Sequence, residues 1–503
     1  MKRFFALLLA MTLLLSGCAC IPGSKMPANT DRYFLYAAND RVYCLDSKTG
    51  KTDEIRTAVP VSGINNALIA DSGKKMAFEA TIKDSEDYAL FYWDGKSDSA
   101  NLVDKNADMA RINKKMDFLI YMKAHDGHYD LYQHDLKKHS VQRIAENVNK
   151  VSMTEDGKSI LYLQAIPEEE QFVLFQKKRN SNPKRISEVS LQREVSATPD
   201  HKVVCYTKGE SENVLGGLCS AYMWTPTGGE KQLPFKATDI KVFDKDEIYY
   251  IASGSGFSCY YYNGKTSKLL SEAASGHGHK LSDEIYSYRG IDENSEKYTV
   301  QYAVHKGKQT DLGGYVCSNS TKLGGLSSDG KTVYSWYTKG RMYRTTLGVT
   351  GNLSTEQYLN TGNNYTPRGM QFYGDHLAYA DEGRLYLDGQ MIASEYEDFE
   401  LSVDGKTLVY TSNGCVYRYS DGKSTFLCRT VDTHLPTASK NVVLVDGGVL
   451  YLGDGNKTEQ IAADCQDIAP ARPWSVKSEG NIIIDGWTTG MWYTMMGTDL
   501  IVY

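Results

Sequence analysis

The chain has 503 residues, a formal net charge of −6, and 41% hydrophobic residues. This length exceeds the usual limit for one simple core, so we expect one large repetitive fold or two domains. The mild acidity argues against nucleic acid, or an anionic membrane face, as the main partner.

Residues 1–17 have the pattern of a cleaved secretory signal. Lys2 and Arg3 form a short basic region, and an apolar run of about 12 residues follows from Phe4 to Leu15. Such a run is too short for a membrane-spanning helix, which needs roughly 20 residues. The segment ends in Leu-Ser-Gly-Cys at residues 15–18, which resembles the lipobox of bacterial lipoproteins.

This resemblance implies that the Cys18 thiol carries diacylglycerol and that cleavage makes Cys18 the new N-terminus. Acylation with further chains such as palmitate would make the anchor stable. Cys20 matches the pattern less well. The resemblance therefore implies an extracytoplasmic protein, lipid-anchored to the cell membrane, with residues 18–32 as its tether. Removing residues 1–17 leaves 54 basic and 62 acidic residues, a formal charge of −8.

The rest of the composition predicts an all-β fold. The chain has 36 Tyr and 44 Gly but only 12 Pro. Aromatic residues favour half-buried strands, and glycines mark the turns between them. We therefore expect β-strands throughout the mature chain.

One short pattern recurs along the chain: an apolar residue, an aromatic residue, and a stretch that ends in Asp, Asn or Gly. Its aromatic positions are Tyr43, Tyr92, Tyr132, Phe175, Tyr222, Tyr261, Tyr302, Tyr343, Tyr386, Tyr417, Tyr451 and Tyr493. The mean spacing is about 41 residues, which is typical of a four-stranded β-propeller blade.

A second pattern, Asp-Gly-Lys followed by alternating apolar residues, precedes many of these positions. It occurs at residues 155–162, 328–334 and 403–410, and more loosely at 71–78. Asp-Gly supplies the positive φ of a tight hairpin turn, so each copy predicts a turn between two strands of a blade. The repeats resemble those of TolB-like propeller proteins, which implies a fold and transfers no function.

Twelve blades would exceed the four to eight that are typical of one propeller. We therefore expect two tandem propellers, residues 33–276 and 283–503, joined by a small, flexible linker near residues 275–283. Seven plus five blades, or one eight-bladed ring with additions, are the alternatives.

Two pairs of cysteines are candidate disulfides. Counting outward from the Asp421-Gly422 turn places Cys415 opposite Cys428, and Cys205 and Cys219 flank another predicted hairpin. An oxidising compartment would permit both bridges. Separate buried thiols are the equally weighted alternative.

Two groups of histidines raise the question of a metal. His125, His128, His134 and His139 fall within one repeat, and residues 277–279 read His-Gly-His. A metal site needs converging ligands, so we interpret the first group as a solvated blade edge and the second as linker. We predict neither metal nor cofactor.

Trp474, Trp487 and Trp492 cluster near the C-terminus. Exposed tryptophans could stack on sugar rings or anchor a partner, and packing inside the last blade is the alternative. The chain lacks a Gly-x-Ser-x-Gly elbow, His-Glu-x-x-His and Cys-x-x-Cys, so we assign no catalytic residue.

Three functions remain. We favour a propeller that binds or scaffolds a protein or peptide partner at the membrane. The alternatives are a glycan-binding surface protein and a propeller-based lyase or hydrolase. We expect no enzymatic activity, although the sequence leaves this open, and no nucleic-acid partner.

Overall fold

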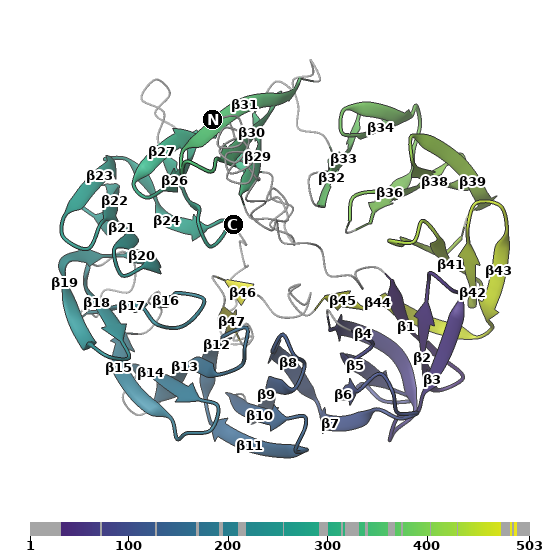
Figure 1. The fold of residues 1–503 in the computed structure, drawn as a ribbon, viewed down its shortest axis with the longest axis horizontal. Coiled ribbons are helices and arrows are strands. Elements are labelled where there is room, and N and C mark those ends of the chain that lie inside the picture. The colour runs from purple at the N-terminus through teal and green to yellow at the C-terminus, as the bar shows by residue number, and fades with distance from the viewer. Residues whose placement is uncertain are drawn as a thin grey trace, which may run out of the picture.

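The structure is a computed structural model, which describes residues 32–70, 73–125, 128–166, 171–190, 195–209, 218–254, 256–290, 300–312, 315–316, 331–337, 341–360, 368–373, 376–402, 404–429, 431–473, 483–484 and 487–489. These residues form eleven β-sheets and no helix. The sheets stand side by side as the blades of one ring (Figure 1). None of the described segments could cross a membrane as a helix.

Each blade has four strands, of which the first lies innermost in the ring and the fourth outermost. Blade 1 contains β44 (Cys465–Pro470), β1 (Tyr33–Ala38), β2 (Arg41–Asp46) and β3 (Lys51–Ile55). Blade 2 contains β4 (Val61–Ile69), β5 (Met76–Ile82), β6 (Tyr88–Trp93) and β7 (Asn101–Lys105). Blade 3 contains β8 (Ala107–Ile112), β9 (Phe118–His125), β10 (His128–Asp135) and β11 (Ser140–Ala145). Blade 4 contains β12 (Val148–Met153), β13 (Ser159–Ile166), β14 (Gln171–Lys178) and β15 (Lys184–Ser190).

The next four blades follow the same order. Blade 5 contains β16 (Val195–Ala197), β17 (Val204–Lys208), β18 (Cys219–Thr225) and β19 (Gly229–Ala237). Blade 6 contains β20 (Asp239–Asp244), β21 (Glu247–Ser253), β22 (Phe257–Tyr262) and β23 (Ser267–Ser271). Blade 7 contains β24 (Ala274–Lys280), β25 (Tyr286–Gly290), β26 (Val300–His305) and β27 (Lys308–Asp311). Blade 8 contains β28 (Tyr315–Val316), β29 (Thr332–Tyr337), β30 (Arg341–Leu347) and β31 (Leu353–Asn360).

The last three blades complete the ring. Blade 9 contains β32 (Arg368–Tyr373), β33 (His376–Asp381), β34 (Arg384–Leu387) and β35 (Gln390–Ala393). Blade 10 contains β36 (Asp398–Leu401), β37 (Leu408–Ser412), β38 (Cys415–Ser420) and β39 (Lys423–Arg429). Blade 11 contains β40 (Thr433–Pro436), β41 (Val442–Asp446), β42 (Val449–Gly453) and β43 (Thr458–Ala462).

The two ends of the chain close the ring in blade 1. β44 pairs antiparallel with β1, so that Phe34 lies opposite Pro470. Beyond β44, β45 (Arg472–Pro473) runs parallel to β4. A final hairpin of β46 (Ile483–Ile484) and β47 (Trp487–Thr489) pairs with β12, on the inner side of blade 4 (Figure 1).

The chain is one eleven-bladed β-propeller, and the expectation of two tandem propellers is therefore wrong. The stretch expected to link them contains β24, the innermost strand of blade 7. Small residues there reflect close packing of this strand, because a side chain at Gly278 would collide with Tyr286. Residues 1–31, which include the predicted signal and most of the tether, lie outside the described part of the chain.

The aromatic repeat is confirmed at eleven of its twelve positions, each in the third strand of a different blade. The twelfth, Tyr493, lies outside the described residues. In nine blades an aromatic residue of the second strand stacks or packs against one of the third, with ring centroids 5.0 to 6.2 Å apart. Such cross-strand pairs stabilise a sheet and account for the abundance of tyrosine.

The hydrophobic core is divided among the blade junctions. The described residues contain eleven buried apolar clusters, and each lies between two neighbouring blades. Both faces of every sheet are thus covered by the adjacent sheets. Because burial of apolar area drives folding, each blade depends on its neighbours for stability.

The Asp-Gly-Lys pattern forms the turn between the first and second strands, as predicted. Thr154 and Ser402 each donate a hydroxyl hydrogen bond to the Asp two residues later, at 2.8 and 2.6 Å. Each hydroxyl also accepts the N–H five residues later. Gly157 and Gly405 have φ of 69° and 72°, the left-handed region that favours glycine. The predicted turns at 71–72 and 328–330 lie outside the described residues.

Blade 5 has the same turn with histidine in place of glycine. Thr198 bonds Asp200 as in the other copies, and His201 has φ of 55°. The buried ring of His201 reaches blade 4, where Nε2 lies 3.0 Å from Ser152 Oγ and Nδ1 lies 3.2 Å from Ser159 Oγ. Burial lowers the pKa of His201 to about 4.

We expect His201→Gly to destabilise the protein by about 1–2 kcal/mol at pH 7, because lost hydrogen bonds and packing outweigh relief of the left-handed conformation. Below the ordinary pKa near 6.5, His201 binds a proton in the unfolded chain, whereas in the folded chain it binds one only near pH 4. Stability therefore falls as pH drops from 6.5 to 4. Urea unfolding at pH 7 and pH 5 should show this loss in the wild type and a smaller one in the variant. An equal loss in both would contradict the assignment.

Side chains fasten the innermost strands to one another. At five junctions a backbone N–H of an innermost strand is accepted by a side chain of the preceding blade. The donor and acceptor pairs are Ile64 and Asp467, Met109 and Glu79, Val242 and Ser196, Gly278 and Asp239, and Leu401 and Gln371, at 2.7 to 3.0 Å. These bonds satisfy donors at the inner sheet edge, which would otherwise be exposed for pairing.

Candidate functional site

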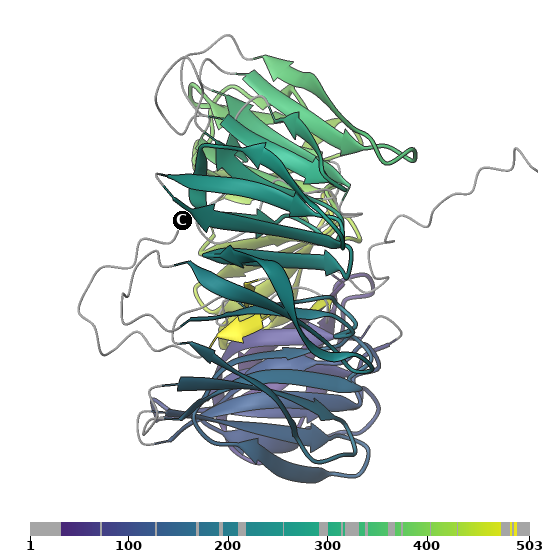
Figure 2. The same cartoon turned by 90° about the vertical axis from the view of Figure 1, so that its left-hand side faces the viewer.

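The ring has two unlike faces, because alternate connections fall on opposite sides of antiparallel sheets. We call the side with the connections between first and second strands, and between third and fourth strands, the turn face. The opposite side, with the connections between second and third strands and between blades, is the loop face. Figure 2 shows the ring edge-on, with the strands running across its thickness.

The loop face is strongly acidic. Its described connections contain only two basic residues, Arg56 and Lys83. They contain eleven acidic residues: Asp40, Asp84, Glu86, Asp87, Glu146, Glu272, Glu382, Glu395, Glu397, Asp432 and Asp464. All of these except Asp40 are exposed. This side of the ring therefore carries a concentrated negative charge, which attracts cations and basic surfaces.

The turn face has the opposite balance. Its described connections contain thirteen acidic residues: Asp94, Asp98, Asp117, Glu155, Asp156, Asp200, Asp246, Asp283, Glu284, Asp388, Asp404, Asp421 and Asp454. They contain eighteen basic residues: Lys48, Lys74, Lys75, Lys96, Lys114, Lys115, Lys137, Lys138, Lys158, Arg179, Lys202, Lys245, Lys265, Lys306, Lys331, Lys406, Lys440 and Lys457. The two faces of the ring therefore differ in charge, which the net charge of the whole chain does not show.

A group of carboxylates and a tyrosine lies at the junction of blades 2 and 3. Glu79 Oε1 accepts the Met109 N–H at 2.7 Å, and Asp108 Oδ1 accepts the Tyr88 hydroxyl at 2.7 Å. Burial, together with the charge of Asp108, raises the pKa of Glu79 to about 7. Burial also raises the pKa of Asp108, although the Tyr88 hydroxyl opposes it. Glu79 can therefore exchange a proton near neutral pH.

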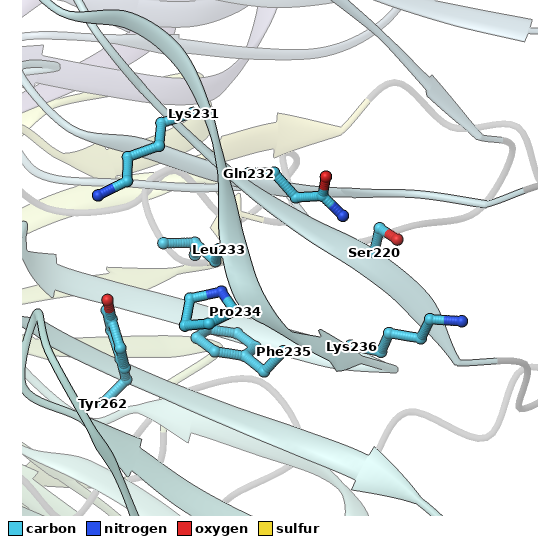
Figure 3. Close-up of a pocket in the computed structure, with 8 residues that line it drawn as sticks. All are labelled: Ser220, Lys231, Gln232, Leu233, Pro234, Phe235, Lys236 and Tyr262. Atoms are coloured by element: carbon cyan, nitrogen blue, oxygen red, sulfur yellow. The ribbon is translucent and has the colours of Figure 1, made fainter.

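A groove of about 670 Å³ lies along β19, the outermost strand of blade 5 (Figure 3). Residues 233–235 form a bulge there, because Ser220 pairs with Lys236 while Tyr222 pairs with Gln232. In Figure 3, Lys231 and Tyr262 lie on one side of this strand, and Ser220, Gln232 and Lys236 lie on the other. The groove thus straddles a sheet edge.

The floor of this groove is already occupied by the protein's own rings. Phe235 stacks on Tyr250, with centroids 3.8 Å apart. A bulge, a proline and flanking lysines are devices that prevent edge strands from pairing with other chains. We interpret the groove as a protected edge, with Pro234 at its centre.

Neither predicted disulfide is present. Cys415 lies opposite Arg429 and Cys428 opposite Val416, because the register shifts between Val416 and Tyr417. Neighbouring positions on a strand point to opposite faces, so the two thiols diverge. Cys205 lies opposite Met223, four residues from Cys219, which at about 3.3 Å per residue is too far for a bridge.

We expect thiol titration of unfolded, unreduced protein to find all seven described cysteines reactive, since all are free. They are Cys44, Cys205, Cys219, Cys259, Cys415, Cys428 and Cys465. Fewer reactive thiols from this set, mapped by mass spectrometry of labelled peptides, would contradict the strand register of blades 5 and 10.

The four histidines of the first predicted group do not share one environment. His125 and His128 lie opposite each other in β9 and β10. His134 is buried, 6% exposed, and so is not part of a solvated edge as we expected. Burial lowers the pKa of His134. His279 lies in β24 and is exposed. In the described part of the chain, no group of three or more His, Cys, Asp or Glu could hold a metal ion.

The predicted tryptophan cluster is only partly placed. Trp474 and Trp492 lie outside the described residues. Trp487 begins β47, whose backbone pairs with β12 of blade 4. The role predicted for the three tryptophans stays a prediction.

Exposed apolar side chains are scattered over the described residues. Most of the large ones, including Val141, Leu269, Met391 and Phe426, lie on outermost strands of different blades. Single exposed apolar residues are normal on soluble domains. Charge is therefore the property that most clearly distinguishes one surface of this ring from another.

Sequence reasoning missed this polarity because it considered the charge of the whole chain. The signal was present, since hairpin connections alternate between the two sides of a blade. Sorting the connections by their order within each predicted blade would have separated the basic set from the acidic set.

No family model and no curated protein matches this chain. Solved structures with related architecture include the β-propeller domain of the Trilobed protease from Pyrococcus furiosus, with 12% identity and a TM-score of 0.33, covering 66% of this chain and 98% of that one. TolB from Acinetobacter baumannii has 15% identity and a TM-score of 0.27, covering 56% and 83%. An oligogalacturonate lyase from Vibrio parahaemolyticus has 10% identity and a TM-score of 0.35, covering 70% and 95%. Likenesses of this size carry no conclusion about activity or ligand.

Proposed function

We propose that this protein is an extracytoplasmic lipoprotein, anchored through Cys18, whose propeller binds a basic protein or peptide on its loop face. The charge of that face is the observation that carries the proposal, with eleven acidic residues against two basic ones in its described connections. Concentrated charge of one sign speeds encounter with an oppositely charged partner and excludes wrong ones. Loops on a rigid scaffold are also where binding residues concentrate.

The test is affinity capture with the full-length protein, extracted in mild detergent from its own cell envelope. A loop-face variant combines Asp84→Asn with Glu86→Gln in the exposed turn between β5 and β6. A matched turn-face variant combines Glu155→Gln with Asp421→Asn. We expect a basic protein to be captured by the wild type and the turn-face variant, to be depleted with the loop-face variant, and to be released by high salt.

Other outcomes would redirect the proposal. Recovery of polysaccharide without protein would support the glycan-binding alternative. Recovery of neither would contradict the binding role and favour a search for enzymatic substrates. Mass spectrometry of the N-terminal peptide tests the anchor separately, because lipid on Cys18 adds the mass of its acyl chains.

A further inference from the structure

The chain enters the ring on the turn face. β1 is the second strand of blade 1 and runs toward the loop face, so Arg32, which precedes it, lies on the turn face. The Arg32 guanidinium donates to both carboxylate oxygens of Asp46, from Nε at 3.1 Å and from Nη2 at 2.9 Å. A bidentate ion pair of this kind fixes the orientation of the arginine side chain as well as its distance from the carboxylate. The tether thus leaves the ring at a defined point.

The length of the tether limits which face can approach the membrane. About 15 residues separate Cys18 from Tyr33 in the sequence, and a random coil of that length spans roughly 20 Å on average. Strands of six to eight residues make the ring roughly 20–25 Å thick, and two further strands lie outside β1 at about 5 Å spacing. A path around the rim would therefore stretch the tether to roughly 35 Å, well beyond its average span, whereas the turn face can lie next to the bilayer without any stretching.

The charge of the turn face suits the same arrangement. Its described connections contain five more basic than acidic residues, and Arg32 adjoins them. Lys115, Lys138 and Lys265 are exposed, and none has an ion-pair partner among the described residues. Basic residues held near an anionic leaflet are attracted to it within about a Debye length. The acidic loop face would be repelled from the same surface.

We propose that the turn face lies against the membrane, with its lysines next to anionic lipid headgroups, and that the loop face points away. This orientation rests on the proposed lipid anchor at Cys18. It leaves the acidic loop face accessible to a partner that approaches from outside the membrane. The lipid and the lysines then act together, as a single acyl chain and a basic patch do in other anchored proteins.

The orientation is tested on the full-length lipidated protein in vesicles of phosphatidylcholine, phosphatidylglycerol and a nickel-chelating lipid. A spin label is placed through Lys265→Cys on the turn face, or through Glu272→Cys on the loop face of the same blade. An unsubstituted protein gives the background from native cysteines. We expect headgroup nickel to relax the label at position 265 severalfold more than the label at position 272. Equal or reversed relaxation would overturn the orientation.

The part played by charge is tested with Lys115→Glu, Lys138→Glu and Lys265→Glu together. We expect these changes, or vesicles in which phosphatidylcholine replaces the phosphatidylglycerol, to reduce the difference in nickel-induced relaxation between a turn-face label at Lys96→Cys and the loop-face label at Glu272→Cys. An unchanged difference would show that the tether alone sets the orientation and would overturn the headgroup contact.

A missing lipid anchor gives a different result. If mass spectrometry finds no lipid on Cys18, the proposed anchor fails, and the turn face is tested by co-sedimentation of the full chain with the anionic vesicles. If the turn face contacts the headgroups, the chain should bind these vesicles in a salt-sensitive way. The three lysine substitutions should weaken that binding about tenfold. No binding in that assay would overturn the contact as well.

Discussion

Replacing Gly278 by alanine is expected to destabilise the protein by about 3 kcal/mol. A Cβ on Gly278 would lie 1.8 Å from the Tyr286 hydroxyl oxygen and 2.4 Å from its ring carbon Cζ. Tyr286 cannot yield easily, because it is fully buried and stacks on Tyr249 with ring centroids 4.4 Å apart. The Gly278 N–H is also held by Asp239 at 2.7 Å, so movement of β24 would lose this bond.

Thermal and urea unfolding measure this effect, and Gly254→Ala is the matched control. Gly254 follows β21 in the neighbouring blade, and no atom would lie within 4 Å of its new Cβ. We expect the control to change stability by less than about 0.5 kcal/mol. If residues 275–283 were a flexible linker, alanine at position 278 would be as harmless as at position 254. The comparison therefore tests the single ring against two tandem rings.

Replacing Glu79 by glutamine is expected to stabilise the protein above pH 7, by up to about 3 kcal/mol. The carboxyl of Glu79 has a pKa of about 7 in the folded chain, against an ordinary value of 4.5. Between these values the folded chain binds a proton that the unfolded chain has released, so wild-type stability falls as pH rises from 4.5 to 7. Glutamine has no charge to bury, and its carbonyl oxygen can still accept the Met109 N–H.

The measurement is the free energy of unfolding of both proteins from pH 4 to pH 8. We expect the two curves to meet near pH 4 and to separate as pH rises. Glu86→Gln, in the exposed turn after β5, is the control for removal of one negative charge and should leave the wild-type slope intact. Parallel curves for wild type and Glu79→Gln would show that this carboxyl is not proton-linked to folding.

The position of Glu79 relates its ionisation to the proposed binding face. Glu79 joins blade 2 to the innermost strand of blade 3, near the side where the loop-face acids lie. Ionisation of Glu79 above neutral pH adds negative charge to a junction that is packed with apolar side chains and already contains Asp108. The variant therefore separates the contribution of this buried carboxyl from that of the exposed acids proposed to bind a partner.

The sequence by itself determined the blade and its internal order. Eleven aromatic repeat positions fall in third strands, and the described Asp-Gly-Lys turns join first strands to second strands. Both signals are local, because a hairpin turn and a cross-strand aromatic pair depend on residues within one blade. The lipid anchor at Cys18 remains a prediction, since it lies outside the described residues.

Only the tertiary structure decided how many blades share one ring, because that number depends on packing between blades rather than within them. The same holds for the thiols of Cys415 and Cys428, which a shift of one position between Val416 and Tyr417 separates. The two charged faces depend on both levels: the order of connections within each blade assigns each charge to one side, and the closed ring brings that side of all blades into one surface. Local patterns thus specify the repeating unit, whereas contacts between units decide how many units close into one ring.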